Sequence, residues 1–88
     1  MKGTLDYLNE AKARLGLESD YALAKHLGLT VGTVSHYVNR RRVIDNYTAA
    51  RLAEILGIDP IEIIATAEFE REKDEQRKSF WKGFVRCV

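Results

Sequence analysis

Apolar residues recur at helical spacing along most of the chain, whereas alternation of apolar and polar positions never lasts more than a few residues. Recurrence at i, i+3, i+4 and i+7 is typical of amphipathic helices, so the pattern predicts an all-α protein. Five such stripes fall within the first 66 residues and predict five helices. Their inward-facing residues are expected to be Leu5, Leu8, Ala11 and Leu15, then Leu23, Ala24 and Leu27, then Val34, Tyr37 and Val38, then Ala49, Leu52, Ala53 and Leu56, and finally Ile61, Ile64 and Ala65.

The ends of these helices are predicted from residues that favour helix caps. Side chains that accept hydrogen bonds from free backbone N–H groups stand before the five stripes: Thr4, Ser19 or Asp20, Thr30, Asp45 or Asn46, and Asp59. Glycines that adopt the left-handed conformation are expected to end three of the helices: Gly16, Gly28 and Gly57. Pro60 suits the first position of the fifth helix, and Glu62 completes a capping box with Asp59.

Residues 67–88 differ in pattern from the five-helix segment. Nine of the eleven residues from position 68 to position 78 are charged, which suits an exposed helix that acts as a semi-rigid spacer. Two pairs support that helix: Glu70 with Lys73, and Asp74 with Lys78. Apolar side chains then return in a narrow stripe: Phe80, Trp81, Phe84, Val85 and Val88. We therefore expect a five-helix domain over residues 1–66 and a charged helical extension with an aromatic end over residues 67–88.

Composition limits the classes of function. With 88 residues, of which 45% are hydrophobic, the chain can bury one small core. The single cysteine, Cys87, excludes an intrachain disulfide, and with two histidines it builds no metal site. The sequence has neither a Ser, His and Asp arrangement nor a glycine-rich phosphate loop, so we expect no enzymatic activity and no cofactor. No apolar stretch approaches the roughly 20 residues of a membrane span and no export signal is present, which predicts a cytoplasmic protein without a membrane partner.

Charge is unevenly distributed, although the net charge is only +1. Between positions 25 and 51, Asp45 is the one acidic residue among five basic ones: Lys25, Arg40, Arg41, Arg42 and Arg51. Positions 68–75 are, in contrast, mainly acidic. Because a local basic patch attracts phosphate even when the whole chain is nearly neutral, the middle of the sequence is the expected contact region for nucleic acid.

The second and third predicted helices are joined by a short segment with an informative spacing. Ala24 is followed by Gly28 after four residues and by Val34 after six more. A small residue at 24 lets the two helices approach, Gly28 adopts the left-handed conformation of a sharp turn, and Val34 fills the angle between the helices. This spacing predicts a helix-turn-helix unit.

At this point residues 5–65 resemble the DNA-binding domain of the lambda repressor and Cro type, the Xre family. The order of the five helices carries the resemblance, together with Asn39-Arg40 after the third helix and the stretch Leu56-Gly57-Ile58-Asp59-Pro60. The sequence is most similar to small phage-related members, in which a short acidic helix and an aromatic tail follow the five helices. The resemblance implies that the third helix, residues 31–38, enters the major groove of double-stranded DNA.

The third helix has two different faces, which agrees with that implication. By position in the family, contacts with base edges or groove walls are expected from a small, mainly polar set: Thr30, Val31, Gly32, Ser35, His36 and Asn39. Most members carry a longer polar side chain where Val31 and Gly32 stand, so DNA shape and Arg40 are expected to contribute more here. Phosphate contacts are expected from a second set: Ser19, Tyr21, Lys25, Thr33, Arg40, Arg41 and Arg42.

These observations predict a sequence-specific transcriptional regulator, and the resemblance favours a phage or prophage repressor. An architectural or excision factor is the alternative within DNA binding, and an antitoxin-like or anti-repressor-like interaction module is the alternative outside it. The aromatic segment could fold back, dock another protein or pair with a second copy, and we expect a homodimer because one short recognition helix covers one half-site. The residues expected on that surface are Phe80, Trp81, Phe84 and Val85. No inducer domain fits in the remaining residues, so regulation is expected from concentration, degradation or a partner protein.

Overall fold

The structure is a computed structural model that describes residues 2–85, and all regular structure in this range is helical. The helices are α1 (Thr4–Arg14), α2 (Asp20–Leu27), α3 (Val31–Val38), α4 (Asn46–Leu56), α5 (Pro60–Arg71) and α6 (Glu75–Lys82). The prediction of an all-α fold with five helices and a helical extension is confirmed. Of the residues named above, Cys87 and Val88 lie outside the described range.

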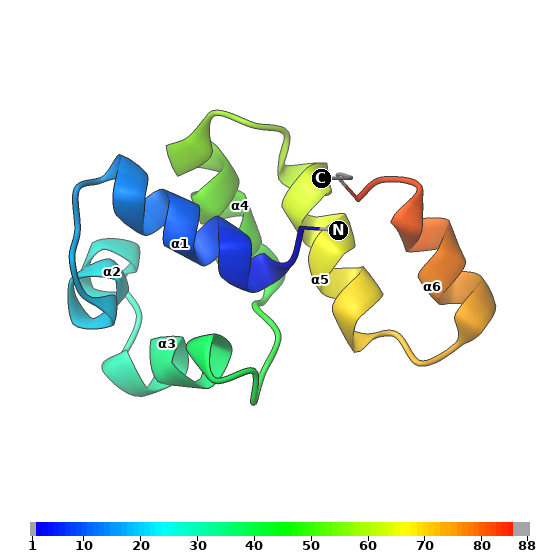
Figure 1. Cartoon of the computed structure of the whole chain (residues 1–88), viewed down its shortest axis with the longest axis horizontal. Coiled ribbons are helices and arrows are strands. Elements are labelled where there is room, and N and C mark those ends of the chain that lie inside the picture. The colour runs from blue at the N-terminus through cyan, green and yellow to red at the C-terminus, as the bar shows by residue number, and fades with distance from the viewer. Residues whose placement is uncertain (1, 86–88) are drawn as a thin grey trace.

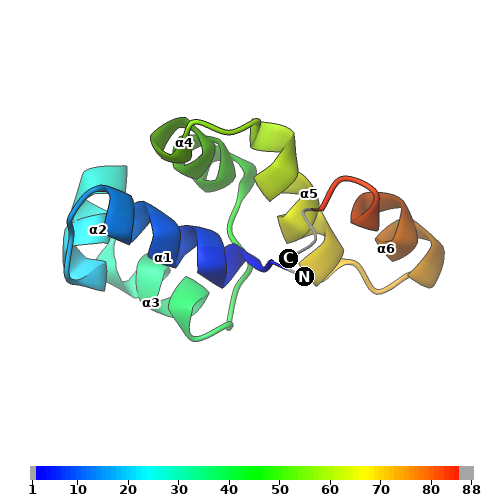
Figure 2. The same cartoon turned by 45° about the horizontal axis from the view of Figure 1, so that its top comes forward.

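The helices give the molecule two distinct ends. α2 and α3 lie at one end and α6 lies at the other, with α1, α4 and α5 between them (Figure 1). Figure 2 shows the same separation after the molecule is turned. α4 and α6 both pack against α5, and α1 packs against α4. The molecule is 37 Å long, so the surfaces at its two ends are far enough apart to contact different partners.

The core agrees with the predicted stripes in α1 to α4, except that Val38 is half-buried and not part of it. In α5 the core includes Ala65 and Ile64 packs against it, as predicted, whereas Ile61 is not part of it. Ile61, expected to face inward, is 40% exposed, whereas Ile63 is fully buried. The buried face of α5 includes Ile63, Thr66 and Ala67 at i, i+3 and i+4. α5 is covered by α4 and also by α6, so its buried positions do not form one apolar stripe. The prediction for α5 assumed such a stripe and therefore placed Ile61 on the buried face.

Most predicted caps are confirmed. Ser19, Thr30, Asp45 and Asp59 each accept a backbone N–H bond at the start of their helices, and the three glycines have φ values of 68°, 71° and 68°. Thr4 is wrong as the first cap, because Gly3 holds that position and its N–H donates to the Asp6 carboxylate at 2.8 Å. Glu62 is wrong as a capping-box residue, because its carboxylate accepts the Tyr7 hydroxyl at 2.5 Å.

The expectation of a continuous charged helix after residue 67 is wrong. α5 continues to Arg71, Glu72 is extended, and α6 then runs back beside α5 (Figure 1). Carboxylates in this segment accept backbone N–H groups: Glu72 accepts those of Lys73 and Asp74, and Asp74 caps α6. The division at residues 66 and 67 falls inside α5 and stays a prediction.

Neither of the expected pairs within the charged segment forms. The Glu70 carboxylate accepts the backbone N–H and the hydroxyl of Thr4 at 2.7 and 2.6 Å, which ties the end of α5 to the start of α1. The Lys78 ammonium donates to the Phe69 carbonyl at 2.8 Å and lies over its ring, which ties α6 to α5. Glu70 and Lys78 therefore connect different helices, whereas the sequence pattern predicted pairs within one helix.

Candidate nucleic-acid interface

The α2–α3 unit forms a helix-turn-helix in which each predicted residue has its expected place. Gly28 ends α2 with φ 71°, a left-handed conformation that residues with a Cβ rarely adopt. The N–H of Leu29 donates to the Ala24 carbonyl at 2.8 Å, which closes the turn. Ala24 is 1% exposed and Val34 is fully buried. The turn thus fixes the angle at which α3 leaves the core.

The two faces of α3 have opposite exposure. Val34 and Tyr37 are buried, at 0% and 4% exposed, and they anchor the helix to the core. Of the six residues expected to contact bases, His36 is half-buried and the other five are exposed: Thr30, Val31, Gly32, Ser35 and Asn39. An anchored helix with an exposed face of small side chains can approach a flat or grooved surface closely.

Two of these polar side chains are engaged within the helix itself. The Thr30 hydroxyl accepts the N–H of Thr33 at 3.1 Å and shares a hydrogen bond with its hydroxyl at 2.9 Å. The Asn39 amide donates to the Ser35 carbonyl at 2.9 Å and to its hydroxyl at 3.2 Å. A contact from Asn39 to a base would therefore replace hydrogen bonds that it already makes.

The residues expected to contact phosphate lie on α2, on α3 and after α3. Ser19 caps α2 and accepts the N–H of Ala22 at 3.1 Å. Tyr21 is 62% exposed and Lys25 is exposed, whereas Thr33 is half-buried. Asp20 pairs with Lys12 at 2.9 Å, so its charge at the start of α2 is partly compensated.

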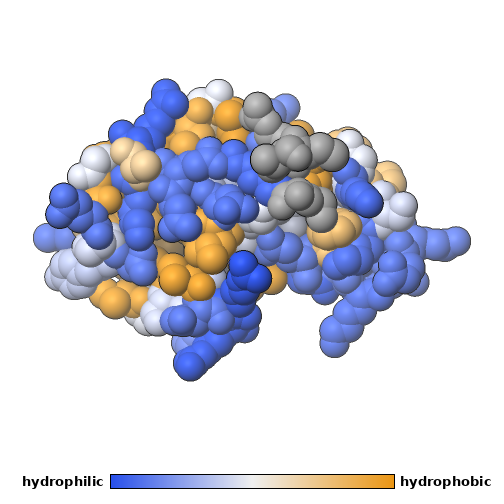
Figure 3. Space-filling view, in the orientation of Figure 1, coloured by the Kyte–Doolittle hydropathy of each residue, from blue (hydrophilic) through white to orange (hydrophobic). Residues whose placement is uncertain are grey.

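The segment after α3 presents three consecutive arginines, and all three are exposed. Arg40 holds a left-handed conformation with φ 59°, and the N–H of Arg41 donates to the His36 carbonyl at 2.8 Å. The Arg42 guanidinium lies 6.0 Å from the centre of the Tyr37 ring. In the space-filling view, hydrophilic side chains project from the edge of the molecule that the end of α3 occupies (Figure 3).

The electrostatic effect of this segment reaches the start of α4. The neighbouring Thr48, whose backbone N–H donates to the carboxylate at 2.8 Å, lowers the pKa of Asp45, and the positive charge of Arg42 lowers it further. Tyr47, in the first turn of α4, is 59% exposed, and its hydroxyl accepts a bond from Arg51 at 2.9 Å. Tyr47 was not among the residues predicted to contact DNA, although the i, i+4 spacing of an aromatic residue and an arginine is visible in the sequence.

The aromatic residues of α6 do not share one environment. Phe80 and Phe84 are 61% and 47% exposed, Trp81 is half-buried and Val85 is 7% exposed. The three rings contact one another, with centre distances of 5.2 to 6.2 Å. Folding back therefore accounts for Val85 and part of Trp81, and it leaves a small exposed surface formed by Phe80 and Phe84, which we call the α6 aromatic surface.

Two further properties of the described range concern metal ions and membranes. Residues 2–85 contain no group of three or more His, Cys, Asp or Glu side chains that could hold a metal ion. Among the same residues, no helix has the length and apolar character needed to cross a membrane.

Comparison with known proteins agrees with this geometry. A family model described as helix-turn-helix matches residues 11–63, a range that extends from α1 into α5 and contains the whole α2–α3 unit. Neither a curated protein nor a solved structure matches the chain. Since the match covers more than half of the sequence, the chain belongs to the helix-turn-helix family of the Xre and lambda-repressor type, whose members bind DNA sequence-specifically and regulate transcription.

Proposed function

We propose that this chain is a homodimeric transcriptional repressor, of the phage or prophage kind that its sequence resembles, and that α3 enters the major groove of its operator. One combination of features carries the proposal. Val34 and Tyr37 anchor α3 to the core, its opposite face is small and exposed, and three exposed arginines follow it. An α-helix fits the major groove, and arginines at its end are suited to the phosphates that border the groove.

Base discrimination would come from few side chains. Ser35, His36 and Asn39 can exchange hydrogen bonds with base edges, and the exposed Val31 can contact a thymine methyl group. Asn39 would have to release its two bonds to Ser35, which reduces its net contribution. Shape and deformability of the operator would therefore supply part of the specificity.

The α6 aromatic surface supports the dimer. One protomer presents one recognition helix, and proteins of this architecture gain affinity by occupying two half-sites. α6, which carries Phe80, lies at the end of the molecule opposite α2 and α3 (Figure 1), and Phe84 follows this helix by two residues. A second copy bound there would leave both recognition helices accessible.

Selection of bound duplexes from a random pool, followed by affinity measurements across salt concentrations, tests the proposal. We expect enrichment of an inverted repeat and binding that weakens steeply as salt rises. Weak binding without sequence preference would favour an architectural or excision factor. Absence of DNA binding at moderate salt would contradict the proposal and favour an interaction module.

Charge reversal at two different places distinguishes direct phosphate contacts from the effect of net charge on DNA binding. Arg41→Glu combined with Arg42→Glu should abolish binding to every duplex, because two attractive contacts become repulsive. Lys73→Glu combined with Arg77→Glu makes the same change in net charge at two exposed positions, one before α6 and one within it, so it should leave most of the affinity intact. Equal losses in both double variants would show that the arginines after α3 have no special role.

His36→Ala tests base contact at a single position. Because one base contact contributes discrimination of about 1–3 kcal/mol, the variant should relax preference at one or two operator positions with a smaller loss of affinity. A uniform loss across all sequences would instead assign His36 to the phosphate backbone.

A further inference from the structure

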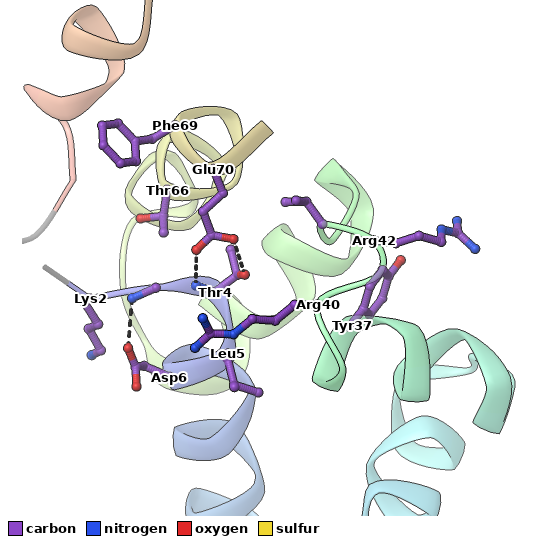
Figure 4. Close-up of a pocket in the computed structure, with 12 residues that line it drawn as sticks. Lys2, Thr4, Leu5, Asp6, Tyr37, Arg40, Arg42, Thr66, Phe69 and Glu70 are labelled. Atoms are coloured by element: carbon purple, nitrogen blue, oxygen red, sulfur yellow. Dashed lines mark hydrogen bonds between the residues drawn. The ribbon is translucent and has the colours of Figure 1, made fainter. Parts of the chain in front are cut away.

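A pocket of about 440 Å³ lies beside the exit of α3, between the start of α1 and the end of α5. Its apolar lining includes Leu5 from α1, Val43 from the α3–α4 segment and Phe69 from α5. Figure 4 shows Arg40 turned back from the end of α3 toward Leu5 and Asp6, and Arg42 on another side of Tyr37. Sites for small organic ligands combine apolar surface with polar groups that fix the orientation of the ligand. In this pocket the apolar side chains stand beside five charged ones, of which three are basic and two are acidic.

The polar groups of the pocket differ in whether they already have partners. The carboxylate of Asp6 accepts the N–H of Gly3, and that of Glu70 accepts two groups of Thr4. Lys2, which also lines the pocket, pairs with Glu10 and lies over the ring of Tyr7.

Two of the remaining polar groups are guanidiniums, which only donate. Within residues 2–85, the guanidinium of Arg40 forms no hydrogen bond or ion pair, and neither does that of Arg42. Both side chains line the pocket. Because a guanidinium offers several N–H groups in a planar fork, its preferred partner is a carboxylate or a phosphate.

The backbone of Arg40 gives an independent reason to assign it a role. The other three left-handed positions in residues 2–85 are all glycines, and each of them follows a helix in the same way that Arg40 follows α3. A left-handed conformation is unfavourable for a residue with a Cβ. An arginine therefore stands where glycine would fit the backbone better, which points to a function of its side chain.

We propose that this pocket binds a small organic anion, with its carboxylate or phosphate group on Arg40 and its apolar body against Leu5, Val43 and Phe69. Arg42 adds positive charge at the rim. Since both arginines are also candidate phosphate contacts, the bound anion would compete with DNA for them. The binding site stands by itself, whereas the competition rests on the proposed function.

Titrations of the full chain followed by amide resonances in NMR test the site without DNA. The probes are benzoate, phenyl phosphate and inorganic phosphate at millimolar concentration. We expect benzoate or phenyl phosphate to shift resonances of Leu5, Val43 and Phe69, with inorganic phosphate at least severalfold weaker because it lacks an apolar body. Inorganic phosphate that binds as tightly as the organic probes would overturn the proposal, because the arginines would then bind any phosphate without the apolar pocket. Absence of resonance shifts with every probe would also overturn it.

Two variants make the test specific. Arg40→Gly keeps the left-handed backbone without strain, so it should fold with a higher Tm and lose at least tenfold in probe affinity. Arg41→Ala removes a neighbouring charge that does not line the pocket, and it should retain the wild-type affinity. If Arg40→Gly folds and binds the probes as the wild type does, the assignment of Arg40 is wrong.

Competition is measured separately, on the duplex selected as described above. We expect the bound probe to weaken DNA binding by the wild type and to have no effect on Arg40→Gly. DNA binding that is unchanged by a saturating probe would contradict the proposed competition, but the pocket would still be a binding site for the anion. Failure of the wild type to bind any duplex would contradict the proposed function and would leave the NMR result unaffected.

Discussion

Arg40 is the residue at which backbone and side chain have opposing requirements. Its φ of 59° costs about 1 kcal/mol for a residue with a Cβ, and a glycine there would recover that cost while adding entropy to the unfolded chain. We expect Arg40→Gly to raise the free energy of unfolding by roughly 0.5 kcal/mol, measured by urea denaturation. Arg41→Gly is the control: Arg41 does not have a positive φ, so this variant should be slightly less stable than the wild type.

Tyr7 and Glu62 form a buried contact between α1 and α5. Burial, and then the hydrogen bond to Glu62, raise the pKa of Tyr7 well above its ordinary value. Tyr7→Phe removes a bond to a charged acceptor and should lower the free energy of unfolding by about 1.5–3 kcal/mol near neutral pH, measured by denaturant unfolding.

The raised pKa of Tyr7 also predicts how stability depends on pH. In the unfolded chain the phenol ionises near pH 10, whereas in the folded chain it keeps its proton to higher pH. The contribution of Tyr7 is therefore complete below about pH 10 and is lost as pH rises from there through the folded pKa. Tyr7→Phe should show a shallower decline than the wild type above pH 10, and parallel declines would contradict this account.

Single polar residues were predicted well where their partners are local. Ser19, Thr30, Asp45 and Asp59 bond backbone N–H groups two or three residues away, and spacing in the sequence reveals such bonds. Thr4, Glu62 and Glu70 were assigned local partners and instead bond residues 55 or 66 positions away. Nothing in the local sequence distinguishes these two cases.

At the scale of elements, the two glycines of the helix-turn-helix unit have opposite requirements. Gly28 has φ 71°, whereas Gly32 lies within α3. Gly28→Ala should cost about 1–2 kcal/mol of stability through backbone strain. Gly32→Ala should instead add roughly 0.5–1 kcal/mol, since its new Cβ would meet only the Thr30 hydroxyl, at 3.9 Å. Thermal unfolding of the two variants measures both effects, and shifts in the same direction would contradict the assignment.

The end of α5 shows why the extension was predicted poorly. Alternating charges at i, i+3 and i, i+4 favour a helix but do not require one. Glu72 and Asp74 accept N–H groups at a break that lets α6 pack beside α5. The contact of Lys78 in α6 with the carbonyl and the ring of Phe69 in α5 is available only if the helix is interrupted, so packing overrides the local pattern.

At the scale of the whole molecule, the DNA-facing end and the α6 aromatic surface are expected to act independently. Phe80→Ser combined with Phe84→Ser should abolish the dimer in sedimentation experiments and weaken binding to an inverted repeat, while affinity for an isolated half-site stays unchanged. Both residues are largely exposed, so the fold should survive. Ile61→Ser, at another exposed apolar position, is the control and should sediment as the wild type does. A wild type that is monomeric both free and on DNA would contradict the dimer.

The sequence by itself determined the helices whose apolar stripes and caps are local, and also the helix-turn-helix unit, because Ala24, Gly28 and Val34 act through their spacing along the chain. Tertiary structure decided which face of α5 is buried, where the charged segment breaks, and which of the aromatic residues stay exposed. It also decided that Arg40 lies beside α1 and α5 at a pocket. Each of these depends on residues far apart in sequence being brought into contact, which spacing along the chain does not encode.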